Sequence, residues 1–213
     1  MILVTGHKGF IGRNLVKHLE SQGHKVYGFD AVDGDPIELA KKVPWDQIDM
    51  IYHQGAISNT TELDVLKVQR WNVQSSIQIM EEAIKRAIPI HYASSGSVYG
   101  NSIGDHGSYD YNPLNYYAIS KLTVDLWVQE NLSRFKAPVV GFRYFNVYGP
   151  RHQEEGSYST VIAIFRKQKR LGQKLTVVGD GEQRRDFTFV GDVVRANMMA
   201  ADRKSTRLNS SHT

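Results

Sequence analysis

The chain contains no cysteine among its 213 residues, and this absence excludes several kinds of chemistry. A disulfide framework, a thiolate nucleophile, a cysteine-ligated zinc ion and an iron–sulfur cluster all require that residue. No apolar run approaches the roughly 20 residues that a membrane-spanning helix needs. A strong excess of one charge is also lacking, because 26 basic residues stand against 22 acidic ones and the net charge is only +4. The composition therefore predicts neither a membrane partner nor a nucleic-acid partner.

The hydrophobic content of 41% and the charged content of 23% are typical of a folded chain. The length suffices for one large domain, or for one domain with a small lobe. The amino terminus runs from Met1 directly into an apolar segment and lacks the basic region and cleavage site of a signal peptide, so we expect a cytoplasmic protein. The eight histidines show no pairing with carboxylates at metal-ligand spacing, and no metal site is predicted.

Short apolar segments alternate with segments of helical periodicity. Helical spacing recurs between Ile11 and Gly23, over 70–87 and over 117–131. Strands are expected at 2–5, 26–29, 48–52, 90–93 and 139–144. This alternation predicts an α/β fold built on a doubly wound parallel sheet of the Rossmann type.

A glycine-rich turn follows the first expected strand and opens the first helix, with Gly6, Gly9 and Gly12 at a spacing of three. Gly6 permits a tight turn, Gly9 lets backbone N–H groups approach a pyrophosphate, and Gly12 allows close packing of helix on strand. Asp30 ends the second strand, where a carboxylate would accept hydrogen bonds from the hydroxyls of an adenosine ribose. Because such a carboxylate repels a 2′-phosphate, NAD is favoured as the cofactor, and NADP stays open.

The chain changes character near Gly149-Pro150, after which it is more basic and alternates less strictly. We therefore predict a dinucleotide-binding domain over 1–149 and a small, partial substrate-binding lobe over 150–201. Residues 202–213 have no apolar period, and they look like the translation of a common sequencing-adapter oligonucleotide. We interpret them as a non-native tail, with a polar natural tail as the alternative. On this interpretation the net charge without the tail is +2, and the natural chain continues past Ala201.

Three further residues carry a candidate chemistry. Tyr117 and Lys121 stand four apart on one face of an expected helix. A nearby cation would lower the pKa of the tyrosine and let it act as a base toward a sugar hydroxyl. Ser95 ends a strand 22 residues before Tyr117 and could hold the same substrate oxygen.

Several motifs together resemble the extended short-chain dehydrogenase/reductase family, the group of NAD-dependent nucleotide-sugar epimerases and dehydratases. The motifs are Thr5–Gly12, Ser94–Gly100 and Tyr117–Lys121. Within that family, the segments 52–62, 113–115 and 141–151 look most like ADP-glycero-manno-heptose 6-epimerases. Gln153, 158–162 and 179–183 look more like UDP-hexose 4-epimerases.

The resemblance implies a set of site residues. By match to family positions, the catalytic residues are Ser95, Tyr117 and Lys121. The cofactor would be contacted by Gly6, Gly9, Phe10, Ile11, Gly12, Asp30, Gln54, Gly55, Ala56, Ile57, Ser58, Asn72, Tyr117, Lys121 and Val147. The nucleotide-diphosphate sugar would be contacted by Ser95, Asn146, Ser157 and Arg185. Family members are commonly oligomers, so the resemblance also leaves a homo-oligomer open.

The implied reaction is an epimerisation through transient oxidation to a keto-sugar and re-reduction on the other face. Two departures bear on the subfamily. Glu155, beside Glu154, stands where the heptose epimerases carry a lysine as a second acid/base. Ser95-Gly96 replaces the Thr-Asp or Thr-Glu of the dehydratases, which argues against a dehydratase. A UDP-hexose 4-epimerase and a non-catalytic dinucleotide-binding regulator remain as alternatives to a heptose 6-epimerase.

Overall fold

The computed structural model describes residues 1–101, 110–152 and 161–202. Its centre is a sheet of five strands in the order β2-β1-β3-β4-β5, and every neighbouring pair is parallel. The strands are β1 (Ile2–Thr5), β2 (Val26–Phe29), β3 (Met50–His53), β4 (Ile90–Ser95) and β5 (Val139–Tyr144). The chain reverses its direction of winding between β1 and β3, so the carboxyl ends of these two strands form a switch point at which such sheets bind ligands.

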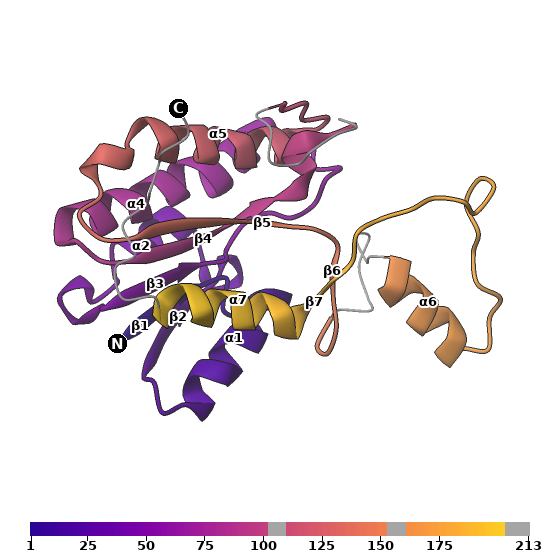
Figure 1. Cartoon of the computed structure of the whole chain (residues 1–213), viewed down its shortest axis with the longest axis horizontal. Helices are drawn as coiled ribbons and strands as arrows, with labels where there is room; N and C mark the ends of the chain where they lie inside the picture. The colour runs from indigo at the N-terminus through magenta and orange to yellow at the C-terminus, as the bar shows by residue number, and fades with distance from the viewer. Residues whose placement is uncertain (102–109, 153–160, 203–213) are drawn as a thin grey trace.

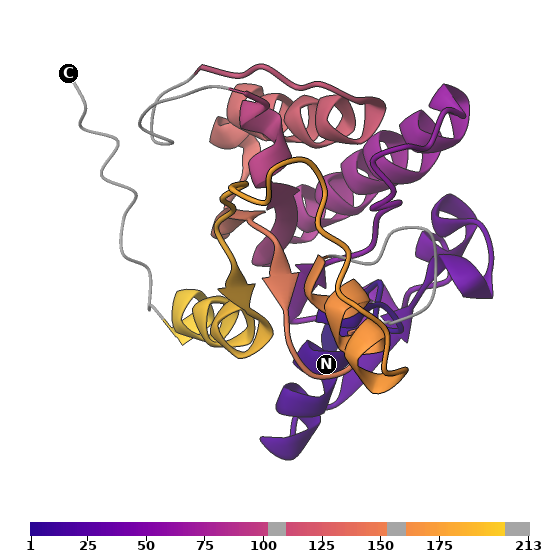
Figure 2. The ribbon, with the colours of Figure 1, turned by 90° about the vertical axis from the view of Figure 1, so that its right-hand side faces the viewer.

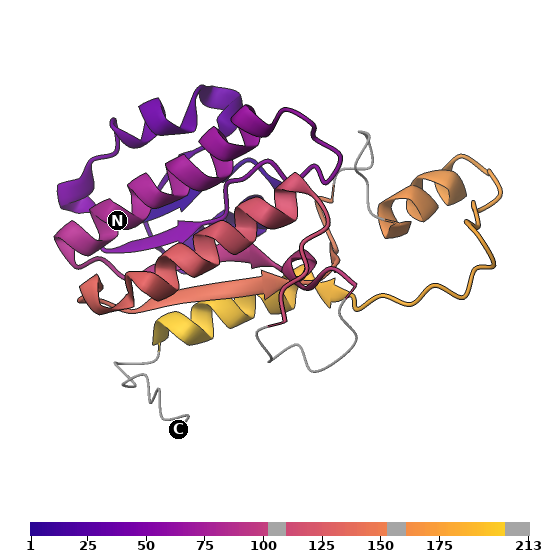
Figure 3. The same ribbon diagram turned by 90° about the horizontal axis from the view of Figure 1, so that it is seen from above.

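Helices cover both faces of the sheet (Figure 1). The long helices α4 (Ser75–Arg86) and α5 (Tyr116–Glu130) run side by side over one face, as Figure 3 shows, and the short α2 (Pro36–Ala40) lies beyond α4. The other face carries α1 (Phe10–Ser21) and α7 (Val190–Asp202), which pack against each other. The predicted doubly wound α/β fold is confirmed.

The two core layers follow from the alternation of side chains along the short strands. Leu3 and Ile51 point to the layer beneath α4 and α5, whereas Val4 and Tyr52 point to the layer beneath α1 and α7. All four side chains are buried. Strands buried on both faces read as continuous apolar runs, which is why the sequence pattern identified them.

The expected helix over 70–87 is interrupted in the structure. The segment consists of α3 (Val65–Val68), a π-helical stretch over Gln69–Gln74, and α4. The third strand was expected at 48–52 but lies at Met50–His53. Both differences are at element ends or in a local change of helical pitch, which apolar periodicity does not specify.

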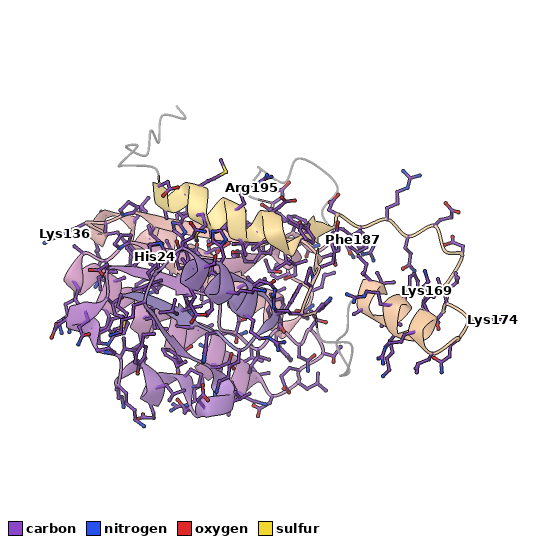
Figure 4. All side chains as sticks on the ribbon, turned by 90° about the horizontal axis from the view of Figure 1, so that it is seen from below. His24, Lys136, Lys169, Lys174, Phe187 and Arg195 are labelled. Carbon is purple, nitrogen blue, oxygen red and sulfur yellow. The ribbon has the colours of Figure 1, made fainter. Side chains whose placement is uncertain are left out.

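A smaller part of the chain leaves the sheet after β5. Two short parallel strands, β6 (Val147–Tyr148) and β7 (Thr188–Phe189), bracket the helix α6 (Val161–Arg170), which projects from the body (Figure 1). Figure 4 shows Lys169 and Lys174 on this projection. Because α7 returns to pack on α1, the projecting part ends before residue 190. Among the described residues, no helix has both the length and the apolarity that crossing a bilayer requires.

Candidate active site

A cavity of about 560 Å³ opens at the carboxyl ends of the parallel strands. Figure 2 views the molecule from this end, toward which β5 runs and from which α6 projects. The cavity collects most of the residues that the sequence analysis singled out. Its walls include Gly6, Gly9, Phe10, Ile11, Gly12, Asp30, Gln54, Gly55, Ala56, Ile57, Ser58, Ser95, Tyr117, Lys121, Asn146 and Val147.

The glycine-rich turn has the close packing that the sequence predicts. A Cβ atom on Gly12 would lie 2.0 Å from the carbonyl oxygen of Gly6, and one on Gly6 would lie 2.6 Å from Cα of Gly55. Gly6 also has a φ of +66°, which favours glycine. A side chain at Gly6 or Gly12 would therefore push the turn away from α1 or from the neighbouring loop. The N-terminal end of α1, which attracts anions, thus lies at the cavity wall beside these glycines.

Asp30 lies on the cavity wall at the end of β2. Its carboxylate accepts hydrogen bonds from the backbone N–H groups of Lys8, at 3.1 Å, and Val32, at 3.3 Å. An ionised carboxylate offers about four acceptor sites, so two remain for the hydroxyls of a ribose. The placement and the remaining acceptors fit an adenosine ribose.

Ser95, Tyr117 and Lys121 come together from β4 and α5. Asn115 caps α5 by accepting a hydrogen bond from the backbone of Ala118 at 2.8 Å, which starts the helix beside the cavity. The Lys121 ammonium is buried and donates to the carbonyl oxygen of Ala93 at 2.7 Å. It lies 5.9 Å from the centre of the Tyr117 ring.

Two opposing influences act on the protonation of Tyr117. Burial raises the pKa of the Tyr117 phenol, and a hydrogen bond with the Ser95 hydroxyl partly lowers it. Burial also lowers the pKa of Lys121 to about 8, against the influence of Asp125, which raises it. The hydrogen bond with Ser95 therefore favours the ionised phenol, against the effect of burial.

A partly buried ion pair between Arg143 and Asp125 stands behind Ser95 and Tyr117. The Arg143 guanidinium on β5 donates to Asp125 at 3.0 Å and to the hydroxyls of Tyr99 at 2.6 Å and Tyr111 at 2.8 Å. Asp125 also accepts from Ser94 at 2.9 Å. These contacts tie α5, β4 and the segment that follows Ser95 to one guanidinium, which restricts how far Ser95 and Tyr117 can separate.

The structure places one predicted cofactor residue outside the cavity. Asn72 is buried, and its amide group bonds to both the N–H (2.8 Å) and the carbonyl (3.0 Å) of Ile57 and to the Ser120 hydroxyl (3.0 Å). All of its contacts are thus within the protein. Asn72 supports the wall formed by 54–58 from behind.

One of the predicted substrate residues, Arg185, is not on the cavity wall. Arg185 is exposed, is absent from the cavity wall, and donates to the carbonyl of the adjacent Arg184 at 2.6 Å. Ser157 lies outside the described residues, as do Glu154 and Glu155. Asn146 does line the cavity, and its amide donates to the carbonyl of Asp186 at 3.0 Å.

Several wall residues escaped the sequence analysis. His53 ends β3, and His152 stacks on Phe10 with ring centres 4.4 Å apart. Trp71 and Tyr144 also line the cavity. The strand-end positions of His53 and Tyr144 were a usable signal, because the carboxyl ends of parallel strands meet at one edge. Nothing in the local pattern pointed to His152 or Trp71.

A family model described as the NAD-dependent epimerase/dehydratase family matches residues 2–211. The chain belongs to this family. NAD is accordingly its cofactor, and the glycine-rich turn and the free acceptors of Asp30 fit that dinucleotide.

Solved structures of the same family align closely with this chain. The UDP-glucose 4-epimerase of Thermotoga maritima aligns with a TM-score of 0.85 at 26% identity, over 94% of this chain and 73% of its own. The ADP-L-glycero-D-manno-heptose-6-epimerase of Helicobacter pylori aligns at 0.82 and 30% identity, over 93% of this chain and 72% of its own. The UDP-glucuronic acid 4-epimerase of Bacillus cereus, solved with UDP-glucuronic acid and NAD, aligns at 0.77 and 27% identity over 96% and 74%.

Proposed function

We propose that this chain is an NAD-dependent nucleotide-sugar epimerase that acts through a keto-sugar, and that its substrate is an ADP-heptose epimerised at carbon 6. One observation carries the proposal. Ser95, Tyr117 and Lys121 line the same cavity as the glycine-rich turn and Asp30, so a hydroxyl-activating group and a dinucleotide site share one space. The 30% identity to the heptose epimerase and the motifs at 52–62 and 141–151 support the choice of sugar.

The glycine-rich turn and Asp30 would hold NAD, which would supply the hydride transfer from a sugar carbon and back to its other face. The residues of the chain manage the proton and the oxygen. Once ionised, the Tyr117 phenol can take the proton of the reacting hydroxyl, and the Ser95 hydroxyl, which hydrogen-bonds to the phenol, holds the sugar oxygen beside it. The hydrogen bond with Ser95 and the nearby Lys121 ammonium favour that ionised form. Lys121 keeps a positive charge next to the ring, from a position set by the Ala93 carbonyl.

Replacing Tyr117 tests the catalytic assignment. Tyr117→Phe removes one oxygen atom and keeps the ring, so we expect turnover to fall by about 10²–10⁴-fold while dinucleotide binding stays nearly intact. Turnover is measured by incubating the purified full chain with ADP-heptose and resolving the two epimers. Bound dinucleotide is measured by its release on denaturation. Unchanged turnover in the variant would contradict the assignment.

The same assay separates the candidate substrates. The high structural similarity to the UDP-glucose 4-epimerase and the segments 153, 158–162 and 179–183 favour a UDP-hexose 4-epimerase as the second candidate. Turnover of UDP-hexoses with no turnover of ADP-heptose would replace the heptose proposal with this one. A dinucleotide-binding regulator without catalysis is disfavoured, because such a protein needs neither Tyr117 nor Ser95 in its cavity.

A further inference from the structure

The loop that follows β2 contains a pair of opposite charges fixed to the glycine-rich turn. The Lys8 ammonium donates a hydrogen bond to the Asp33 carboxylate. The second oxygen of Asp33 accepts from the backbone N–H of Asp30 at 3.2 Å. The backbone N–H of Lys8 in turn donates to the Asp30 carboxylate at 3.1 Å. Lys8 is therefore attached to this loop by both its backbone and its side chain.

This pair stands beside the proposed position of the adenosine ribose. Asp30 lines the cavity, and two of its acceptor sites are free for ribose hydroxyls. A 2′-phosphate on that ribose would bring close to two negative charges to a loop that already holds the carboxylates of Asp30 and Asp33. Such a group binds only if a cation is free to meet it.

Lys8 is the cation best placed to do so, because its own backbone contacts Asp30. Its ammonium is engaged by Asp33, whose pKa is lowered chiefly by the hydrogen bond with Lys8. Arg70, the cation on the other side of the loop, is paired with Asp35 at 2.7 Å. Both cations are thus held by carboxylates of the same loop.

We propose that Asp33 enforces the preference for NAD over NADP by holding the Lys8 ammonium away from a 2′-phosphate. This inference rests on the proposed site, in which the adenosine ribose lies at Asp30. It assigns selectivity to two residues beyond Asp30: a carboxylate that repels the phosphate and a lysine that is prevented from binding it. Because the pair is half-exposed, its contribution to the stability of the fold is small, and its effect is on the choice of ligand.

The test is a competition between the two dinucleotides for the full chain. Protein is incubated with equal concentrations of NAD and NADP, freed of unbound ligand, denatured, and the released dinucleotides are quantified. Asp33→Asn keeps the acceptor for the Asp30 N–H but removes the charge, and we expect the NADP-to-NAD ratio to rise about tenfold. In the Lys8→Met background the same substitution should raise the ratio by only about twofold to threefold, because no ammonium is released.

Asp46→Asn is the matched control, since it removes a carboxylate that pairs with Arg86, and Asp46 is not on the cavity wall. Its ratio should equal that of the unaltered chain. An unchanged ratio in Asp33→Asn would overturn the proposal. An equal rise with Lys8 present and in the Lys8→Met variant would overturn it too. Lys8→Met alone gives a second test, because a rise in the ratio there would also contradict it. The readout is the amount of bound dinucleotide rather than turnover, so the result stays interpretable even if the chain does not catalyse the proposed epimerisation. A chain that binds neither dinucleotide would refute both proposals.

Discussion

The imidazole of His53 lies buried on the cavity wall with both ring nitrogens hydrogen-bonded to hydroxyl groups. One nitrogen is 2.7 Å from the Thr5 hydroxyl and the other is 2.8 Å from the Ser76 hydroxyl. Burial and the charge of Lys121 lower the pKa of His53 to about 3. A neutral ring therefore holds the ends of β1 and β3 together beneath the proposed dinucleotide site, and a second positive charge beside Lys121 is avoided.

This lowered pKa predicts a pH-dependent stability. Between about pH 6.5 and pH 3 the unfolded chain binds a proton at His53 that the native state does not bind, so stability present above pH 6.5 is lost as the pH falls. The slope from one such group is at most about 1.4 kcal/mol per pH unit. His53→Gln should flatten the curve of unfolding free energy between pH 4 and pH 6.5, measured by urea titration. His24→Gln, which removes an exposed imidazole (Figure 4), is the control, and equal slopes in His53→Gln and the unaltered chain would contradict the prediction.

At the scale of secondary-structure elements, the π-helical stretch over Gln69–Gln74 gives Asn72 its role. The wider turn places its amide between the loop that forms the cavity wall and the helix α5, where it bonds to both Ile57 and Ser120. An ordinary helical register would rotate this side chain. The π-helical stretch thus connects the wall loop, at Ile57, to the helix α5, at Ser120.

Asn72→Asp tests this joint. The substitution preserves shape but removes the two N–H donors that reach the Ile57 carbonyl and the Ser120 hydroxyl, and it buries a charge. We expect a loss of about 2–4 kcal/mol in the free energy of unfolding and weaker dinucleotide occupancy, although Asn72 is not on the cavity wall. Asn131→Asp is a control in an asparagine whose contacts are local to the end of α5. Unaltered stability in Asn72→Asp would show that the hydrogen bonds of the amide to Ile57 and Ser120 do not stabilise the fold.

On the scale of the whole molecule, the segment after β6 is fastened to the first helix of the fold. Asn14 donates to the Pro150 carbonyl at 3.1 Å and accepts from the Arg151 guanidinium at 2.6 Å. Arg13 donates to the Arg151 carbonyl at 3.3 Å. These contacts join residues more than 130 positions apart and hold the cavity residues Asn146 and His152 over the glycine-rich turn.

We expect Asn14→Ala to loosen the attachment of the segment 150–151 to α1. The substitution removes the two hydrogen bonds to the segment 150–151, as well as one to the Phe10 carbonyl within α1. The first two, at about 1 kcal/mol each and with partial exposure, correspond to about a 5–10-fold weaker binding of the nucleotide sugar. Dinucleotide occupancy should change less, since the glycine turn and Asp30 are untouched. Titration with the substrate and with its bare nucleotide diphosphate measures the difference. An equal loss of affinity for the dinucleotide and for the nucleotide sugar would mean that Asn14 stabilises α1 itself and not the attachment of the segment 150–151.

The residues that line the cavity were largely predictable because they sit in short, contiguous motifs. A glycine turn between strand and helix, a carboxylate at a strand end and a Tyr–Lys pair on one helix face each combine a local conformation with a chemical group, and neighbouring residues determine both. Ser95, Tyr117, Lys121 and Asp30 were found in this way, and all of them line the cavity.

Only the tertiary structure decided which groups touch. Sequence spacing placed Lys121 on the same helix face as Tyr117, and the fold adds the hydrogen bond of its ammonium to the Ala93 carbonyl and the pairing of the phenol with Ser95. The same holds for the engagement of Lys8 by Asp33 and for the stacking of His152 on Phe10. Local sequence determines backbone conformation and which chemical groups are available, whereas contacts between distant segments depend on how the whole chain packs.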